Sequence, residues 1–272
     1  MSGIIISVIN NKGGCSKTTT TCNLAHTLGK LNKKVLVVDN DSQCNSTDIL
    51  LDGIDIGNSI YDVLTNPKII IDNCIYSTTY NNVFCLPNDQ RTAALEIALA
   101  KEFPESLTKY RNKIRDYARS NYDIVMIDNP PNLGLFVAMS LYMSDFVIVP
   151  NEAGSQFSLE GLLNAVEFIN DIRENGNPDL KFLRLLITKV DRRTNACTAI
   201  LAQIEQSFSK DQVFKTIIPI NAAFQQAELL KKTLVRYAGG TPGAKAYKSL
   251  ANELVTLLKK KIRNWDSHNT ID

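Results

Sequence analysis

The sequence predicts an α/β fold in which a twisted, mainly parallel sheet carries helices on both faces. Short runs that are continuously apolar and rich in β-branched residues alternate with longer segments of helical periodicity. Strands of this composition are buried on both faces, which requires helices above and below the sheet. The 272 residues suffice for one large core. Because no stretch has the composition of a linker, we expect a single domain over 1–272.

The elements follow in order along the chain. The run "GIIISVI" at 3–9 predicts the first buried strand, and a helix at 17–31 follows the loop behind it. Further apolar runs predict strands at 33–41, 82–87, 122–128, 145–150, 182–188 and 214–219. Helical patterns predict helices at 91–101, 105–119, 158–173, 194–208, 222–230 and 243–263, the last of which closes the fold. The segment 52–82 is the least regular, and we expect an irregular excursion over the surface there.

Composition excludes several classes of protein. A hydrophobic content of 44% and a charged content of 21% are typical of a soluble globular protein. No apolar stretch approaches the roughly 20 residues that cross a bilayer, and the N-terminal strand lacks the features of a signal peptide. The six cysteines show no metal-ligand spacing, which favours free thiols in a reducing cytosol over zinc or disulfides.

The loop "KGGCSKT" behind the first strand is typical of a nucleotide phosphate site, because it joins a strand to a helix. Glycines let backbone N–H groups converge on an anion, and the helix N-terminus adds its dipole. We expect Lys17 to reach the β- and γ-phosphates and Thr18 to bind Mg²⁺. A glycine-rich turn that merely caps the helix is the alternative, and a dinucleotide site lacks its G-x-G-x-x-G pattern. The expected nucleotide contacts in this loop are Lys12, Gly13, Gly14, Cys15, Ser16, Lys17, Thr18 and Thr19.

Acidic residues end two of the predicted strands. Asp39 and Asp41 follow the second strand, and Asp128 ends the strand "YDIVMID". Carboxylates beside a phosphate loop hold Mg²⁺ and its waters and orient the attacking water. We therefore expect Thr18, Asp41 and Asp128 to form a metal site. A turn or helix cap is the alternative for Asp41.

The loop departs from the ordinary G-x-x-x-x-G-K-[ST] pattern, because Asn11 and Ser16 replace its glycines and Lys12 is added before Gly13. It resembles the K-G-G-x-x-K-[ST] loop of the deviant-Walker-A ATPases of the P-loop type. These include ParA-type partition proteins, MinD, the nitrogenase iron protein and the arsenite-pump ATPase. The resemblance implies that Lys12 reaches across a dimer interface to the partner's ATP, where it acts like an arginine finger. We expect Ser16 to adopt a φ that suits a non-glycine residue. The thiol of Cys15 could make ATP binding sensitive to alkylation.

Later segments resemble the ParA branch. "DNDSQ" is similar to the ParA pattern D-x-D-P-Q, and "DNPP" is similar to D-x-P-P rather than to the MinD signature D-S-P-A-G. The resemblance implies that Asp41 acts in hydrolysis and that Pro130 and Pro131 form a stiff loop that senses the γ-phosphate. No cysteine lies between 86 and 196, which disfavours an iron–sulfur role. The resemblance also places Pro219 and Asn221 against adenine, with a helix cap as the alternative for Asn221.

Charge is distributed unevenly along the chain. Residues 181–263 hold 16 Lys+Arg and 5 Asp+Glu, whereas the remainder holds 14 Lys+Arg and 23 Asp+Glu. This excess predicts a basic face for a polyanion, unless it is an ordinary solvated surface. The resemblance implies nonspecific DNA binding through phosphate contacts, yet Ile220 and Ala223 stand where many ParA proteins carry arginines. The candidate DNA contacts are therefore Lys231, Lys232, Arg236, Lys245, Lys248, Lys259, Lys260, Lys261 and Arg263.

The resemblance implies an ATP-dependent dimerising switch with ATP and Mg²⁺ as cofactors. It would bind nucleoid DNA in the cytoplasm and drive plasmid or chromosome partition, with weak ATP hydrolysis that a ParB-like centromere-binding partner stimulates. One alternative is a positioning ATPase for a protein cargo. Another is a MinD-like membrane-associated ATPase of division-site placement, because the closing helix has an apolar face at 250, 254, 257, 258, 262 and 265. Such a face more often packs on a sheet, so we expect no membrane partner.

Overall fold

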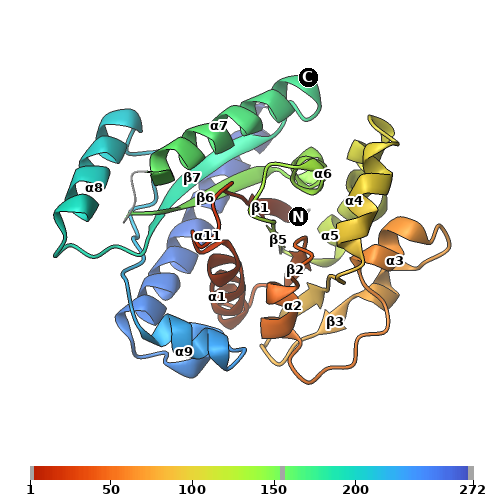
Figure 1. Ribbon diagram of the computed structural model, residues 1–272, viewed down its shortest axis with the longest axis horizontal. Coiled ribbons are helices and arrows are strands. Elements are labelled where there is room, and N and C mark those ends of the chain that lie inside the picture. Colours follow the sequence, from red (N-terminus) through yellow and green to blue (C-terminus); the bar gives the residue numbers. More distant parts are fainter. Residues whose placement is uncertain (1–2, 154–156, 269–272) are drawn as a thin grey trace.

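A seven-stranded sheet forms the centre of the computed structural model, which describes the backbone of residues 3–153 and 157–268 and the side chains of 3–153 and 160–261 (Figure 1). The strands are β1 (Ile4–Val8), β2 (Val35–Asp39), β3 (Tyr76–Ser77), β4 (Val83–Leu86), β5 (Ile124–Asp128), β6 (Phe146–Glu152) and β7 (Lys181–Thr188). The α-helices are α1 (Lys17–Lys30), α2 (Asn45–Leu50), α3 (Ile60–Thr65), α4 (Thr92–Ala100), α5 (Asp116–Asn121), α6 (Leu135–Met143), α7 (Phe157–Asn175), α8 (Asn195–Ser207), α9 (Ala223–Leu229), α10 (Leu234–Tyr237) and α11 (Pro242–His268). Two short 3₁₀ segments, η1 (Ile71–Cys74) and η2 (Glu105–Thr108), and a π-helical turn, η3 (Arg111–Arg115), complete the described part.

The strand order is β3-β4-β2-β5-β1-β6-β7. Every pairing is parallel except the short antiparallel contact between β3 and β4. The mainly parallel sheet expected from the sequence is therefore confirmed. Register places Asp128 opposite both Val8 and Asp39, so the carboxyl ends of β5, β1 and β2 meet at one edge.

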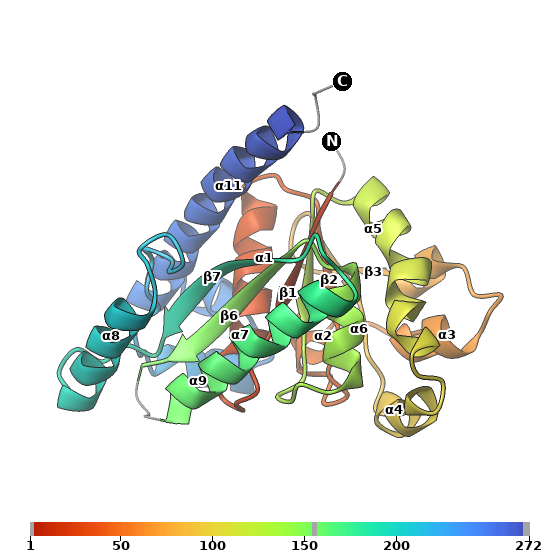
Figure 2. The same cartoon turned by 90° about the horizontal axis from the view of Figure 1, so that it is seen from above.

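Helices cover both faces of the sheet, as expected (Figure 2). On one face α1 and α11 pack together, and Leu24 and Leu28 join Leu250 and Leu254 in the core cluster that includes β1 and β2. On the other face lie α5, α6, α7 and α8, whose buried residues form the clusters with β5, β6 and β7. Full burial of a leucine side chain contributes about 1.5–3 kcal/mol to the stability of the fold. The packed helices therefore stabilise the sheet whose carboxyl edge carries the loops after β1, β2 and β5.

The segment 214–219 is not the strand that the sequence predicts. It forms two isolated bridges with β7 and the residues after it, Leu185 with Val213 and Val190 with Pro219, and one further backbone hydrogen bond, from Ile218 to Ile187 at 2.9 Å. Between these bridges the backbone N–H groups of Lys215 and Thr216 donate to the carboxylate of Glu253 on α11, at 2.8 and 3.0 Å. These two N–H groups therefore donate to the Glu253 side chain rather than to a neighbouring strand, and the β-ladder is interrupted at this place.

Two helical regions also differ from the prediction. The helix α6 was not predicted, because "LFVAMSLYM" is apolar on all sides and most of it is buried, which leaves no period to detect. The single helix predicted at 105–119 is divided into η2, η3 and α5. Hydrophobic periodicity does not distinguish 3₁₀, π and α geometry, since all three present similar faces over a few residues.

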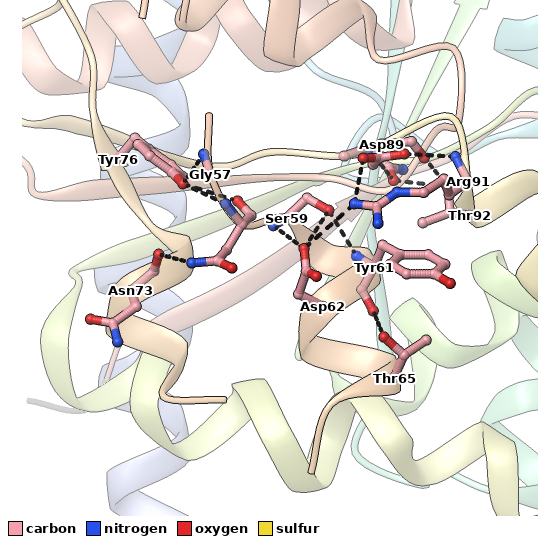
Figure 3. Close-up of polar contacts among 12 residues, drawn as sticks. Gly57, Ser59, Tyr61, Asp62, Thr65, Asn73, Tyr76, Asp89, Arg91 and Thr92 are labelled. Atoms are coloured by element: carbon pink, nitrogen blue, oxygen red, sulfur yellow. Dashed lines mark hydrogen bonds and ion pairs between the residues drawn. The ribbon is translucent and has the colours of Figure 1, made fainter. Parts of the chain in front are cut away.

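The segment 52–82 is more ordered than the irregular excursion that we expected. It contains α3, η1 and β3, and Ile60 and Val63 are buried in a core cluster. A capping box of Ser59 and Asp62 begins α3. Arg91 pairs with Asp62 and Asp89, at 3.8 and 2.7 Å, and so ties α3 to the start of α4 (Figure 3).

At Gly29, helix α1 lies very close to the backbone that precedes β4, and a substitution there tests this contact. A Cβ at Gly29 would lie 2.3 Å from the carbonyl oxygen of Asn81. Although alanine usually favours a helix over glycine by about 1 kcal/mol, Gly29→Ala should lower the free energy of unfolding by about 1–3 kcal/mol because the two backbones must separate. Urea unfolding measures this change. The control Gly240→Ala, where no atom lies within 4 Å of the added Cβ, should change stability little. A stabilised Gly29→Ala would contradict the close contact.

Candidate nucleotide site

A cleft of about 850 Å³ lies at the carboxyl edge of the sheet, between the loop after β1, helix α2 and the segment that contains α9. Its size is within the range of small-molecule sites. Of the residues predicted to contact the nucleotide, Lys12 and Cys15 do not line the cleft. The others do, together with the predicted metal residue Asp41 and the predicted sensing residue Pro131, namely Gly13, Gly14, Ser16, Lys17, Thr18, Thr19, Pro219 and Asn221. The topology thus brings the loop after β1, the acidic loop after β2 and the predicted base-side residues around one space.

Hydrogen bonds fix the start of the phosphate loop. The buried side chain of Asn10 donates to the carbonyl of Pro150 at the end of β6 and accepts from the backbone N–H of Lys12, at 2.8 and 3.0 Å. A Cβ on Gly161 of α7 would lie 2.6 Å from the Asn11 side chain, so α7 packs directly on this turn. The loop is therefore held by β6 and α7 as well as by its own turns.

The prediction that Ser16 has a φ suited to a non-glycine residue is wrong. Ser16 has a φ of 73°, in the left-handed region, as does Gly14 at 74°. This conformation costs a non-glycine residue about 1–2 kcal/mol. The position therefore keeps the backbone geometry of the glycine that the ordinary loop has there. Such strain persists only where the surrounding structure imposes it, and Ser16 is the N-cap residue of α1.

Lys17 lies inside the loop. Its side chain is buried, and its ammonium donates to the carbonyl oxygen of Lys12 at 3.1 Å. Because α1 begins at Lys17, the cation stands where the helix N-terminus also attracts an anion. The arrangement suits the phosphate contact predicted for this residue.

Cys15 does not line the cleft, and it is only 1% exposed. Burial raises the pKa of its thiol, and the neighbouring charge of Lys17 opposes that rise. Since the thiolate is the reactive form, a buried thiol with a raised pKa argues against the alkylation sensitivity that the sequence suggested. The carbonyl oxygen of Cys15 accepts from the Thr188 hydroxyl at 3.4 Å, which joins the loop to β7.

Asp39 and Asp128 lie side by side beneath the cleft and are fully buried. Asp39 accepts from the backbone N–H and the hydroxyl of Thr47, at 2.8 and 2.7 Å. Burial raises the pKa of Asp39, and the nearby charge of Asp128 raises it further. Burial also raises the pKa of Asp128, although the hydrogen bond from Ser46 partly opposes the rise. Asp41, unlike Asp39 and Asp128, lines the cleft itself.

The residues of the predicted metal site fit a hydrated Mg²⁺. One carboxylate oxygen of Asp128, Oδ1, is buried without a hydrogen-bond partner, whereas Oδ2 accepts from Ser46 at 2.6 Å. A buried carboxylate oxygen that lacks a partner is costly unless an ion or water satisfies it. The hydroxyl of Thr18 and the carboxylate of Asp41 supply further oxygen donors beside it, and oxygen ligands are those that Mg²⁺ prefers.

Two buried asparagines connect the acidic loops. Asn40 donates to the side-chain oxygen of Asn129 at 2.8 Å and accepts from the Tyr110 hydroxyl at 2.6 Å. The pair therefore couples the loop after β2 to the loop after β5. Pro131 of that second loop lines the cleft, while Pro130 precedes it and does not. The loop therefore borders the cleft at one of its two prolines, and its sensing role stays a prediction.

Asn221 lines the cleft with Pro219 but is not the helix cap, because Ala222 is the N-cap of α9. Its contact with adenine stays a prediction. Its side-chain oxygen accepts from the backbone N–H of Ala223 at 2.8 Å, as a residue before a helix does. The side-chain amide group, which is not used in this turn, remains a donor that a base could accept from.

Sequence reasoning missed Glu152 and Lys189, which both line the cleft. Glu152 ends β6 and Lys189 directly follows β7, and residues at the carboxyl ends of parallel strands gather at the ligand site. That rule, applied to every strand, would have found them.

The candidate DNA contacts fall into two groups. Lys231 and Lys232 line the cleft, and Lys231 pairs with Asp48 of α2 at 3.1 Å. Arg236 lies over the Tyr80 ring, and Lys261 is half-buried over Phe146. Lys231, Lys232 and Arg236 are nevertheless exposed, as are four lysines of α11 that do not line the cleft, namely Lys245, Lys248, Lys259 and Lys260. The side chain of Arg263 lies outside the described residues.

Comparisons with known proteins show the family of the chain. A family model described as "AAA domain" matches residues 3–182. The sporulation initiation inhibitor protein Soj of Bacillus subtilis is 34% identical over 253 residues, which cover 93% of this chain and 98% of that protein. The chromosome partitioning protein ParA of Myxococcus xanthus is 31% identical, with coverage of 93% and 88%. The crystal structure of cobyrinic acid a,c-diamide synthase from Mycobacterium smegmatis with an ATP analogue and magnesium matches with a TM-score of 0.79, 26% identity and coverage of 94% and 96%.

A glycine loop between a central parallel strand and a helix, beside acidic strand ends, defines a P-loop-type nucleoside triphosphatase. Within this class the chain belongs to the family of ParA-type partition ATPases.

The buried pair of carboxylates should make stability depend on pH when Mg²⁺ and nucleotide are absent. A carboxyl with a raised folded-state pKa contributes stability that is complete below its ordinary value of about 4 and is lost as pH rises through the raised value. Asp39→Asn removes this loss, so its free energy of unfolding relative to the wild type should increase between about pH 5 and pH 8. Urea unfolding across this range measures the difference.

A control for that series is Asp52→Asn, because Asp52 is exposed. Its stability difference from the wild type should stay constant over the same pH range. A constant difference for Asp39→Asn as well would show that burial does not raise the pKa of Asp39.

Proposed function

We propose that the protein is an ATP-driven switch that dimerises around ATP, binds DNA without sequence preference and drives plasmid or chromosome partition. The loop amides and Lys17 would hold the phosphates, and Thr18, Asp41 and Asp128 would hold Mg²⁺. The ion offsets the charge of the phosphates during transfer. Asp41, at the wall of the cleft, would orient the attacking water.

The observation that carries this proposal is the different placement of the two lysines of one loop. Lys17 is buried within the loop, whereas the side chain of Lys12 is 29% exposed and stands at its rim. Lys12 makes its described ion pair with Glu152, at 3.8 Å, and leaves the loop interior to Lys17. A rim lysine is free to meet the phosphates of a second molecule, which makes ATP part of the dimer contact.

The DNA contacts are best supplied by α11. A helix advances by about 100° per residue, so Lys245, Lys248, Lys259 and Lys260 lie within about 120° of its circumference. All four are exposed, while Leu250, Leu254 and Leu258 of the opposite face are buried. A row of lysines contacts phosphates without reading bases. We therefore assign DNA binding to this stripe rather than to Lys231 and Lys232 in the cleft.

A centromere-binding partner would stimulate hydrolysis, which is otherwise weak, and so release the dimer from the nucleoid. The pairing of Asn40 with Asn129 supports such control, because it connects the loop of Asp41 with the loop of Pro131. We place the protein in the cytoplasm at the nucleoid, and we take 1–272 as one domain because one sheet spans the described chain.

A membrane-associated function has less support. The described part of the apolar face of α11, with Leu250, Leu254 and Leu258, is buried in the core cluster that includes α1, whereas the side chains at 262 and 265 lie outside the described residues. Among the described residues, no helix is long and apolar enough to cross a bilayer.

Lys12→Ala should leave ATP binding by the monomer intact and prevent ATP-dependent dimerisation, because the variant keeps Lys17 and loses only the rim cation. Light scattering with ATP, with ADP and without nucleotide measures the state. Lys17→Ala is the matched control and should lose ATP binding itself. Normal ATP-dependent dimers of Lys12→Ala would refute the role given to Lys12.

Lys245→Gln/Lys248→Gln should weaken ATP-dependent DNA binding at every sequence tested. The slope of log affinity against log salt should fall by about 1.8, since each phosphate contact contributes about 0.9. Fluorescence anisotropy at several salt concentrations measures both quantities. The control Lys68→Gln/Lys101→Gln removes the same charge from exposed positions elsewhere and should change affinity less. Binding to anionic liposomes but not to DNA would favour the membrane function instead.

A further inference from the structure

Three charged side chains from three different segments meet beside the phosphate loop. The ammonium groups of Lys12 and Lys189 lie 3.8 and 3.7 Å from the same carboxylate oxygen, Oε2 of Glu152. Lys12 belongs to the loop after β1, Glu152 is the last residue of β6, and Lys189 is the first residue after β7. The β6–β7 register pairs Glu152 with Thr188, so the sheet itself fixes the carboxylate beside Lys189.

Lys189 stands over the phosphate loop and has an unusual backbone conformation. Lys189 has a φ of 52°, a left-handed conformation that is uncommon for a non-glycine residue. Its ammonium lies 3.9 Å from the position that a Cβ on Gly14 would take, so it stands over the phosphate loop. Both Glu152 and Lys189 line the nucleotide cleft. The cluster therefore borders the site where the phosphates would bind.

We propose that Glu152 and Lys189 are positioning residues for Lys12. Glu152 holds Lys12 within its own chain before dimerisation, and Lys189 keeps Glu152 paired when Lys12 leaves for the ATP of the second copy. This inference rests on the proposed function, in which Lys12 acts across the dimer interface. The inference adds that Glu152 and Lys189 determine how easily Lys12 leaves its own chain for the ATP of the second copy.

The strength of the contacts suits such an exchange. The side chains of Lys12, Glu152 and Lys189 are 29%, 25% and 41% exposed, so water and salt weaken each ion pair. A carboxylate that lost its only partner beside a triphosphate would repel it. Because Lys189 shares the same oxygen, the departure of Lys12 leaves Glu152 neutralised rather than alone. Lys189 thereby makes the release of Lys12 easier.

The two positioning residues should consequently have opposite effects. Glu152→Gln frees Lys12 and should lower the dissociation constant of the ATP-bound dimer by about two- to fivefold, the range of one exposed ion pair. Lys189→Met leaves Glu152 with Lys12 as its described partner and should raise that constant by a similar factor. Analytical ultracentrifugation with ATP measures both. Glu152→Asp, which keeps the charge, should remain closer to the wild type than Glu152→Gln.

A second measurement separates positioning from direct binding of nucleotide. Because Glu152 and Lys189 act through Lys12, Glu152→Gln and Lys189→Met should shift the affinity of the monomer for ATP much less than they shift dimerisation, which isothermal titration calorimetry at low protein concentration measures. Thermal unfolding of each variant checks that the fold is retained. Lys68→Met serves as a control for loss of an exposed lysine.

The results distinguish this inference from the function on which it rests. If Lys12→Ala fails to dimerise but Glu152→Gln and Lys189→Met shift dimerisation in the same direction or not at all, the positioning roles are wrong and the proposed function stands. If Lys12→Ala dimerises normally with ATP, both are wrong. Opposite shifts of dimerisation, with a much smaller change in the affinity of the monomer for ATP, would support the inference.

Discussion

The parallel register of three central strands is the constraint on which the site depends. Asp128 lies opposite Val8 of β1 and Asp39 of β2, so the strand that leads into the phosphate loop and both acidic strand ends finish at one level. The hydrogen bonds of a parallel ladder fix this level, and the helices on both faces bury the strands that form it. A shift of one residue would turn each of these side chains to the opposite face of the sheet.

Charges of both signs are then concentrated at that edge. Asp39 and Asp128 are buried beside each other, which raises the pKa of both carboxyls, while Lys17 stands within the loop above them. An arrangement of this kind is costly without ligands, because each buried charge lacks part of its hydration. It is suited to a metal ion and a polyanion, which would satisfy the carboxylates and the lysine at the same time. The strained backbone of Ser16 belongs to the same site, where such strain commonly gathers.

Much of the fold could be predicted from periodicity, because strands that are apolar throughout and helices that are apolar on one face have different patterns. The pattern failed where burial removed the contrast, as in α6, and where a distant side chain changed the hydrogen bonding, as Glu253 does at Lys215 and Thr216. The phosphate loop and its acidic partners could be predicted because their residue types are chemically required at those places. Glu152 and Lys189 carry no such local signature, and only the meeting of β6 and β7 brings them to Lys12.

The sequence by itself determined the class of fold, the loop that carries two lysines, the acidic strand ends and the uneven charge, because these depend on the order and type of neighbouring residues. The tertiary structure alone decided which charges meet. It placed Lys231 in the cleft beside Asp48, left Lys245, Lys248, Lys259 and Lys260 of α11 exposed, and put one carboxylate near both Lys12 and Lys189. Such pairings join residues far apart in the chain, and Coulomb attraction depends on their distance in space rather than along the sequence.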